Sequence, residues 1–391
     1  MSYPVLRLRA GCERRLRSGH PWLYSNEIRP NPELEPGSLV RVMTADGKIF
    51  GVAYYNPHSL IAARMLSRSR DAVIDRRFLE LRLRRALDLR ARMFAEPFYR
   101  LLHAEGDGLP GFVLDRYGEH LVVQLNTAGA ERLWPLLAEA LDALLPARSI
   151  LLRNDAAVRE LEGLPREVRR WRGEPPRRVE LIENDLVFPV DPEHGQKTGW
   201  YYDQRLNRAL VRLFARDQRV LDLYGYSGAF ALNALAAGAR EALVVDASAP
   251  ALELARESAA RQGVASRLAT ERCEVFEILD RFARERRRFG LVLADPPSFV
   301  KSRKTLASGL RAYRRLAELA ARVTAENGVL CVSCCSHNVP VDAFLRELQL
   351  GIKAATRGAR RLALCGQAPD HPVHPMLAET AYLKFAAFAL D

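Results

Sequence analysis

The sequence predicts a multidomain α/β protein whose carboxyl-terminal part is a doubly wound, mostly parallel sheet with a Rossmann-like order of elements. Three observations lead to this prediction. The 391 residues exceed the size of one ordinary domain. Beyond about residue 179, apolar strand-like runs alternate with amphipathic helical segments. After the last helical segment, two neighbouring apolar runs indicate an antiparallel hairpin at one edge of the sheet.

Three domains are expected along the chain. Residues 1–70 contain short runs broken by Pro and Gly, which is typical of a small β-barrel. Residues 72–178 mix helical and strand-like segments and form a central α+β domain. The Pro-rich stretch Gly173–Arg178 marks a boundary, and residues 179–391 form the sheet domain.

Hydrophobic periodicity predicts the elements of the first two domains. In the barrel, an Asp-Gly turn joins two alternating runs and predicts a β-hairpin. The expected elements are the hairpin strands Ser38–Met43 and Ile49–Tyr55, the helices Asp75–Phe94 and Glu131–Leu145, and the strands His120–Leu125 and Ser149–Asn154.

The sheet domain alternates strands and helices. The expected strands are Arg219–Tyr224, Glu241–Asp246, Arg267–Cys273, Gly290–Ala294, Gly328–Cys335, Arg360–Cys365 and Ala381–Leu390. The expected helices are Phe230–Ala237, Ala249–Gln262, Leu310–Ala325 and Val341–Thr356. Parallel strands that end in an antiparallel pair are a hallmark of the class I methyltransferase fold.

Charge is unevenly spread along the chain. The formal net charge is +12, and the first hundred residues account for +9 of it. A basic amino-terminal third on a nearly neutral body indicates a module that docks on a polyanion, and an arginine-rich surface without such a role is the competing interpretation. Charge does not separate RNA from DNA, since both offer phosphates.

Apolar stretches are short throughout the sequence. None approaches the roughly 18 apolar residues of a membrane helix, and the first residues show neither the apolar core nor the cleavage pattern of a signal peptide. The six cysteines are scattered and form no disulfide framework. We therefore expect no membrane partner and a location in the reducing cytoplasm.

The first strand of the sheet domain runs into a loop that contains glycines. Gly225 and Gly228 allow a tight turn and a close approach of the backbone to a ligand. In doubly wound sheets, ligands bind at the carboxyl ends of the strands, at the topological switch point. The candidate cofactor-binding residues at this strand end are Asp222, Tyr224, Gly225, Ser227 and Gly228.

Acidic residues follow three successive strands. Asp222 can meet the ammonium of a methionine moiety, and Asp246, with Ala247 beside it, can accept the two ribose hydroxyls. Glu274 is placed to contact the edge of an adenine. The loop differs from Gly-x-Gly-x-x-Gly, which disfavours a nicotinamide cofactor. We predict S-adenosylmethionine, and acids that merely cap helices are the competing interpretation.

The fourth strand runs into Asp295-Pro296-Pro297. Two prolines after an acid make a stiff loop, which can aim a carboxylate and backbone carbonyls at a nucleobase. Such loops occur in methyltransferases that act on exocyclic amines and in some that act on carbon 5 of pyrimidines. Asp295 is therefore a candidate for the cofactor site and for holding the amine and ring-nitrogen edge of a cytosine.

A cysteine would distinguish these two chemistries. Carbon 5 of cytosine is a poor nucleophile until a thiolate adds at carbon 6, whereas an exocyclic amine needs no such help. Strand alternation places Cys331 and Cys335 on one face and Cys334 on the other, with Cys335 nearest the ligand end. Because this alternation separates the sulfurs of Cys331 and Cys334, we predict no metal site. The residues alone leave Cys335 open as a nucleophile or as a small buried residue.

At these residues the sequence resembles the bacterial large-subunit ribosomal RNA cytosine-5 methyltransferases that have an amino-terminal PUA domain. The likeness covers nearly the whole chain. The segments that carry it are Gly19–Glu27, Tyr55–Ser59 with Arg64, His103–Asp107, Leu109–Gly111, Gly195–Arg208, Asp370–Pro372 and Tyr382–Lys384.

The resemblance implies that 5-methylcytosine is formed in 23S ribosomal RNA, either on the RNA itself or on a large-subunit assembly intermediate. It implies Cys335, followed by Ser336, as the catalytic cysteine, with Cys334 where the family has serine. It further implies that Gln204 and Arg205 lie against the cofactor. The implied RNA contacts are His20, Trp22, Arg64 and Lys197.

Two other functions stay open at this point. An amino-group methyltransferase acting on guanine or adenine in RNA would share the fold and the Asp-Pro-Pro loop but would need no cysteine. A catalytically silent RNA-binding assembly factor would not need Asp222, Asp246 and Asp295, so their presence speaks against it. The sequence leaves the modified nucleotide and the oligomeric state open, a homodimer included.

Overall fold

The computed structural model describes residues 3–30 and 33–391 and divides the chain into two compact units. Unit 1 contains the chain through Val179 together with Val190–Tyr202 and Asp370–Thr380. Unit 2 contains Glu180–Pro189, Asp203–Pro369 and Ala381–Asp391. The predicted multidomain α/β fold is confirmed, and the division into three domains at residues 70 and 178 stays a prediction.

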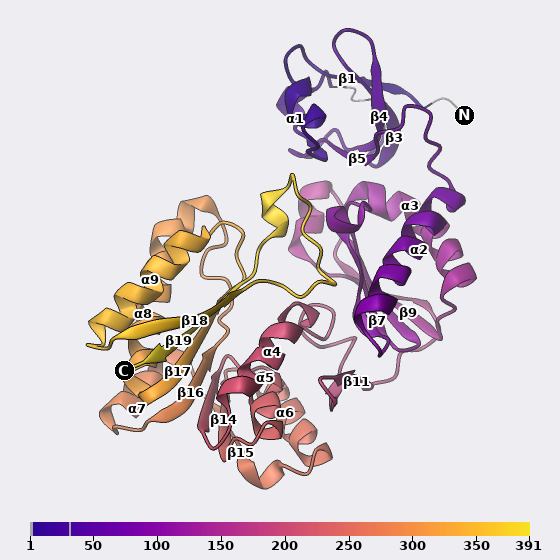
Figure 1. Ribbon diagram of the computed structural model, residues 1–391. Helices are drawn as coiled ribbons and strands as arrows, with labels where there is room; N and C mark the ends of the chain where they lie inside the picture. The colour runs from indigo at the N-terminus through magenta and orange to yellow at the C-terminus, as the bar shows by residue number, and fades with distance from the viewer. Residues whose placement is uncertain (1–2, 31–32) are drawn as a thin grey trace. The chain divides into compact units, whose positions relative to one another are not determined.

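Unit 2 is built on a twisted, mostly parallel sheet with the strand order β15-β14-β13-β16-β17-β19-β18 (Figure 1). The strands are β13 (Arg219–Leu223), β14 (Glu241–Asp246), β15 (Leu268–Arg272), β16 (Phe289–Ala294), β17 (Thr324–Cys334), β18 (Ala359–Cys365) and β19 (Lys384–Leu390). Strand β19 runs antiparallel to both of its neighbours, β17 and β18. The expected antiparallel hairpin at the sheet edge is therefore confirmed.

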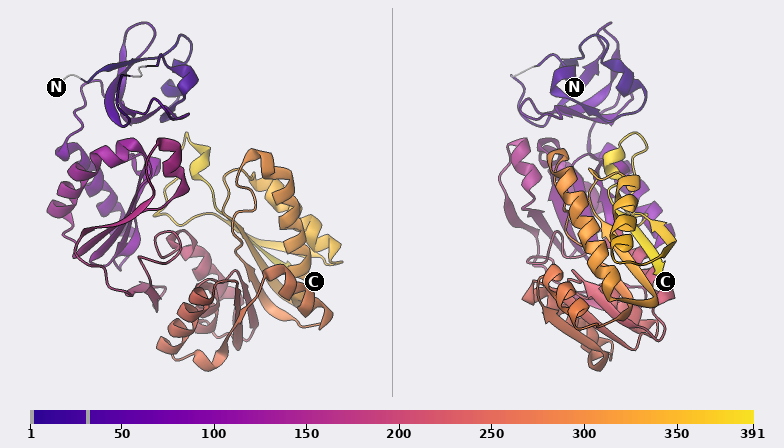
Figure 2. Two further views of the ribbon diagram at one scale, coloured as in Figure 1. Left: turned by 180° about the vertical axis from the view of Figure 1, so that it is seen from behind. Right: turned by 90° about the vertical axis from the view of Figure 1, so that its left-hand side faces the viewer.

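Helices cover both faces of this sheet. They are α4 (Arg205–Val211), α5 (Ala229–Ala236), α6 (Ala249–Arg261), α7 (Val275–Arg284), α8 (Leu306–Val323) and α9 (Val341–Ala354). Helices α5 and α6 pack on β13, β14 and β15, and α4 packs on α5. Helices α7, α8 and α9 pack together on the other face, and Figure 2 shows α8 and α9 lying side by side.

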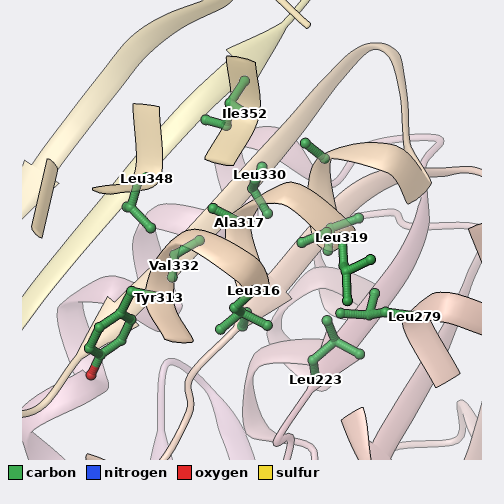
Figure 3. Packing of buried hydrophobic residues seen from close by; sticks show 14 of the residues in the cluster. Leu223, Leu279, Tyr313, Leu316, Ala317, Leu319, Leu330, Val332, Leu348 and Ile352 are labelled. Atoms are coloured by element: carbon green, nitrogen blue, oxygen red, sulfur yellow. The ribbon is translucent and has the colours of Figure 1, made fainter. Parts of the chain in front are cut away.

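One hydrophobic core lies between the sheet and helices α7, α8 and α9 (Figure 3). Leu330 and Val332 of β17 face it together with Leu316 of α8 and Leu348 of α9, and all four are fully buried. The sequence prediction missed α7, although its buried residues recur at helical spacing. Those residues are Val275, Ile278, Leu279 and Phe282.

Unit 1 begins with a small, strongly curved sheet of order β1-β3-β4-β5-β2. Its elements are β1 (Val5–Arg7), α1 (Glu13–Arg17), β2 (Trp22–Leu23), β3 (Ser38–Met43), β4 (Ile49–Tyr55) and β5 (Ala63–Ser67). Strands β3 and β4 pair antiparallel, so the predicted hairpin is confirmed. Strand β1 pairs parallel to β3, and an isolated bridge joins Leu8 to Ile28.

A second sheet of unit 1 has the order β10-β9-β8-β7-β6. Its strands are β6 (Phe98–His103), β7 (Phe112–Tyr117), β8 (His120–Leu125), β9 (Ser149–Asn154) and β10 (Glu167–Arg172), with helices α2 (Arg76–Met93) and α3 (Ala128–Leu144). A two-stranded ribbon follows in the chain, β11 (Val179–Glu183) and β12 (Leu186–Val190). Helix α3 starts three residues before the predicted Glu131, because the Thr127 side chain accepts the amide hydrogen of Ala130 and caps the helix.

Candidate active site

The loop after β13 has a strained backbone. Tyr224 and Tyr226 have φ angles of 58° and 47°, a region that side-chain-bearing residues rarely adopt, and Gly228 follows at 71°. Hydrogen bonds hold this conformation, since the Gly225 amide donates to the Val245 carbonyl oxygen at 3.1 Å and the Gly228 amide to the Gly225 carbonyl oxygen at 2.7 Å. The loop therefore crosses the carboxyl end of the first strand in a fixed conformation, at the edge where ligands bind in such sheets.

The glycine at position 225 is needed because the loop passes directly over Asp222. A Cβ atom on Gly225 would lie 2.6 Å from the Val244 side chain and 3.0 Å from the carboxyl carbon of Asp222. Both distances are shorter than ordinary van der Waals contact. Any larger residue would therefore displace either the loop or the carboxyl group, which supports the sequence-based role of this glycine.

Asp222 places a carboxyl group in a nearly dry environment. Its side chain is 1% exposed, and Oδ2 accepts a hydrogen bond from the Ala231 amide at 3.0 Å. Burial, together with the nearby carboxylates of Asp295 and Asp246, raises the pKa of Asp222 to about 7. A cationic ligand would favour the ionised form, so this carboxyl group is suited to an ammonium.

Asp246 has a fixed orientation at the end of β14. Its Oδ2 accepts from the Tyr226 amide at 3.0 Å, and its Oδ1 accepts from the Ser248 amide at 2.8 Å. The carboxylate thus ties the strained loop to the next strand, with Ala247 exposed beside it. Because each carboxylate oxygen has two lone pairs, both can still accept from a ligand hydroxyl.

The remaining groups of this edge extend the site. Glu274 is exposed at the N-cap of α7, and its charge acts on the Tyr224 hydroxyl, whose pKa is raised mainly by burial. Ser227 is 2% exposed, and its hydroxyl has no hydrogen-bond partner within the described part of the chain. Such a buried, unsatisfied hydroxyl calls for a ligand group. The set of acids, loop amides and hydroxyl therefore fits S-adenosylmethionine.

Gln204 contacts the residues of the Asp-Pro-Pro strand end. Its Nε2 donates to Asp295 Oδ2 at 2.9 Å and to the Ser333 hydroxyl at 3.2 Å. Its Oε1 accepts from Asn207 at 2.6 Å, which fixes the orientation of the amide. Gln204 therefore orients the Asp295 carboxylate, a role that the sequence did not indicate.

Arg205 lies in a buried ion-pair cluster next to this amide. Its Nε is 3.3 Å from Glu183 Oε2, and Arg208 contacts both carboxylate oxygens of Glu183. The sequence did not indicate the contacts of Glu183 and Ser333, because both residues lie outside the Gly195–Arg208 block and show no local motif. Only the tertiary fold brings them to this block. The bond from Asn207 to Gln204 lies within the block and was not predicted either.

The three cysteines of β17 and its end have different environments. Cys331 is 1% exposed and Cys334 is fully buried in the core beneath α8, whereas Cys335 lies one residue beyond the strand and is partly exposed. Burial raises the pKa of both Cys331 and Cys334. The Cys335 thiol lies 3.9 Å from the Pro296 carbonyl oxygen of the Asp-Pro-Pro loop. Of the three, Cys335 is the one that reaches the ligand edge.

The comparisons with known proteins extend over nearly the whole chain. Residues 158–386 match the family described as S-adenosylmethionine-dependent methyltransferase, and residues 6–68 match a PUA-like domain. Ribosomal RNA large subunit methyltransferase I of Klebsiella pneumoniae strain 342 is 34% identical over 388 residues, which cover 98% of this chain and 97% of the relative. The chain belongs to this methyltransferase family. Its cofactor is S-adenosylmethionine.

Further relatives of this methyltransferase agree. The protein of the same name from Yersinia pseudotuberculosis is 36% identical over 383 residues, covering 96% of this chain and 97% of the relative. The solved structure of a methyltransferase from Streptococcus mutans matches with a TM-score of 0.84 at 20% identity, over 99% of this chain and all of that chain. The methyltransferase SMU.776, solved with SAH, matches over the full length of both chains with a TM-score of 0.85 at 20% identity. These two structures show the fold.

The methyltransferase places two of the implied RNA contacts in a polar cluster of unit 1. Trp22 Nε1 donates to Glu105 at 2.6 Å, and the Arg64 guanidinium pairs with the same carboxylate at 2.7 Å. His20 is half-buried, with its ring near that of Trp22. Lys197 is exposed, with its ammonium 4.3 Å from the centre of the Tyr201 ring. Their contact with RNA stays a prediction.

Two features are absent from the described residues, 3–30 and 33–391. They contain no group of three or more His, Cys, Asp or Glu side chains placed to hold a metal ion. They also contain no helix whose length and apolar character would allow it to cross a membrane.

Proposed function

We propose that this methyltransferase forms 5-methylcytosine in 23S ribosomal RNA of the large subunit. One observation carries the choice of carbon 5: the Cys335 thiol lies against the Pro296 carbonyl, at the ends of the adjacent parallel strands β17 and β16. Methylation of an exocyclic amine needs no thiol at this place. The names of the curated relatives support ribosomal RNA as the substrate.

The residues at the strand ends would divide the cofactor between them. Asp222 would hold the ammonium of the methionine part. The 224–228 loop, with Ser227, would hold its carboxylate. Asp246, next to Ala247, would accept the ribose hydroxyls, and Glu274 would face the adenine edge. S-adenosylmethionine supplies an electrophilic methyl group to this edge of the sheet.

The side chains around the target base then have separate tasks. The Cys335 thiolate adds to carbon 6 of cytosine, and the electron pair of the carbon 5–carbon 6 bond makes carbon 5 nucleophilic. Asp295, held by Gln204 at 2.9 Å, accepts from the cytosine amine and keeps the ring in place. After methyl transfer, a base removes the carbon 5 proton, and the returning electron pair expels the thiolate. The Cys335 thiolate is thereby regenerated.

Trapping of the covalent adduct tests this function directly. RNA with 5-fluorocytosine at the target should form a stable adduct with the wild type, because fluorine replaces the proton that must leave. Cys335→Ala should form no adduct and lose methylation, while it still binds S-adenosylhomocysteine. Cys334→Ser is the matched control and should keep most of its activity, because Cys334 faces the core beneath α8.

Two results would overturn parts of the proposal. If the Cys335→Ala and Cys334→Ser variants are both fully active, the thiol mechanism is excluded and methylation of an exocyclic amine is favoured. A dead Cys334→Ser variant with an active Cys335→Ala variant would keep the chemistry and move the nucleophile by one residue. Running the assay on protein-free ribosomal RNA and on purified large-subunit assembly intermediates from the cytoplasm would show which form is the substrate.

A further inference from the structure

A buried lysine lies behind the end of β17. Lys384 begins β19 and is 5% exposed, although a lysine side chain is rarely buried unless it is paired. Its ammonium donates to the Ser336 carbonyl oxygen at 2.6 Å and to the Tyr382 carbonyl oxygen at 3.2 Å.

The sheet register explains why the ammonium reaches this point. In the antiparallel β17–β19 ladder, Lys384 stands directly opposite Cys334, the last residue of β17. Directly opposed residues project from the same face of a sheet, so the lysine side chain extends past Cys334 towards the turn that follows. Cys335 and Ser336 lead from β17 into this turn. The Ser336 hydroxyl donates to the Val300 carbonyl oxygen at 2.7 Å, so the turn is held from two sides.

The groups that act on the two thiols include Lys384, Asp295 and Tyr313. Lys384 acts on both thiols with a positive charge, and burial lowers its pKa. Asp295 acts in the opposite direction on Cys334, and the Tyr313 hydroxyl of α8 interacts with both thiols. A buried positive charge near a thiol favours the thiolate, which is the form that attacks carbon 6.

We propose that Lys384 is a positioning residue for Cys335: its ammonium fixes the Ser336 carbonyl and favours the thiolate of Cys335. This inference rests on the proposed cysteine mechanism. It assigns two effects to one side chain, because the same ammonium orders the turn and supplies charge beside the sulfur. Lys384→Met removes the charge and keeps an unbranched side chain that is one atom shorter, and Lys384→Arg keeps the charge.

The test is the pH profile of thiol alkylation in the full-length protein. Wild type, Lys384→Met and Lys384→Arg are treated with iodoacetamide at several pH values, and peptide mass spectrometry follows Cys335 and Cys334 separately. Loss of one nearby positive charge should raise the apparent pKa of Cys335 by about 1 unit, or slow its alkylation about tenfold below that pKa. Lys384→Arg should restore most of the rate. In methylation assays, Lys384→Met should lower kcat more than it raises KM.

Cys334 is the internal control, because it is fully buried. If Cys334 becomes reactive in Lys384→Met, the lysine merely holds the strand end together and the proposal is overturned. An unchanged Cys335 profile in Lys384→Met also overturns it. Neither result depends on methyl transfer, whereas failure of the 5-fluorocytosine adduct would remove the cysteine mechanism itself. The two failures are therefore distinguishable.

Discussion

Each unit contains a cluster of acidic side chains, and the two clusters differ in how their negative charge is balanced. In unit 1, Glu105 and Glu162 share the guanidinium of Arg64, at 2.7 Å and 3.8 Å. Glu162 also accepts from Asn56 and Ser59, at 3.0 Å and 2.9 Å. Opposite charge and hydrogen bonds therefore offset the desolvation of both carboxylates.

In unit 2, three carboxylates gather at the sheet edge and act on one another. Asp295 and Asp246 both raise the pKa of Asp222, which burial has already raised. Arg208 lowers this pKa, and its guanidinium is also bound to Glu183. A cluster with compensated charge stabilises a fold, whereas a cluster with excess like charge marks a site that a cationic ligand completes.

The largest loss of stability from a single substitution is expected in the cluster of unit 1 around Arg64. Glu105→Ala leaves the 8%-exposed Arg64 without its closest partner and should lower the free energy of unfolding of unit 1 by about 3 kcal/mol. All four tryptophans lie in unit 1, so urea unfolding followed by tryptophan fluorescence reports on it. Glu35→Ala, which removes an exposed acid paired with Arg132, should cost less than about 1 kcal/mol. Equal losses in both variants would contradict the comparison.

For the acidic cluster of unit 2, we expect the free energy of unfolding to depend on pH. Between pH 4 and 7 the folded state keeps a proton on Asp222 that the unfolded state has lost, so stability falls as pH rises, by at most ~1.4 kcal/mol per pH unit. Asp222→Asn should remove this slope and be more stable than wild type at pH 8 without cofactor. Circular dichroism of thermal unfolding at several pH values checks this.

The control for Asp222→Asn is cofactor binding. The variant should bind S-adenosylhomocysteine more weakly at pH 8 than the wild type, because the ionised acid is lost. A variant that is both less stable and equally able to bind would show that the excess charge has no role in the ligand site.

Sequence reasoning was most successful where the pattern is local. The alternation of strands and helices in unit 2, the closing hairpin and the loop at 224–228 follow from periodicity and glycine spacing. Helix α7 was not predicted, although its four buried residues recur at helical spacing, which is a local signal for a helix.

Contacts between distant segments could not be predicted in the same way. The bond from Gln204 to Ser333 spans 129 residues, and Lys384 reaches Ser336 only because β19 is inserted between β17 and β18. The family resemblance placed Gln204 and Lys384 in matching segments, but it gave no geometry. Pairings of this kind depend on strand order and register, which no local pattern contains.

A smaller effect, on cofactor affinity, is expected for Asp246, which binds the 224–228 loop. Asp246→Ala should weaken S-adenosylhomocysteine binding by roughly 1.5–3 kcal/mol, the range for losing a hydrogen-bonded charged group. The substitution also removes the hydrogen bond that the Tyr226 amide donates to Asp246, so the strained loop should become less ordered. Isothermal titration calorimetry measures the affinity. Unchanged affinity would exclude the ribose assignment.

The smallest effect is expected on the exposed surface of unit 1, where charge acts without burial. Removing residues 1–70 would be a poor test of RNA docking, because it would also leave Glu105 and Glu162 without Arg64. Lys197→Ala is a more specific test than the deletion, because this lysine is exposed and its ammonium lies over the Tyr201 ring.

If Lys197 contacts one phosphate, its loss should weaken ribosomal RNA binding by about 1 kcal/mol or less. The slope of log K against log salt should fall by about 0.7–0.9, because one fewer counterion is released. Lys353→Ala, an exposed lysine at the end of α9, is the matched control and should leave the slope unchanged. Filter binding between 50 and 200 mM salt, a range in which phosphate contacts dominate the salt dependence, measures both variants. Equal slopes in the two variants would remove Lys197 from the RNA-binding surface and leave the remaining positive charge of unit 1 to account for docking.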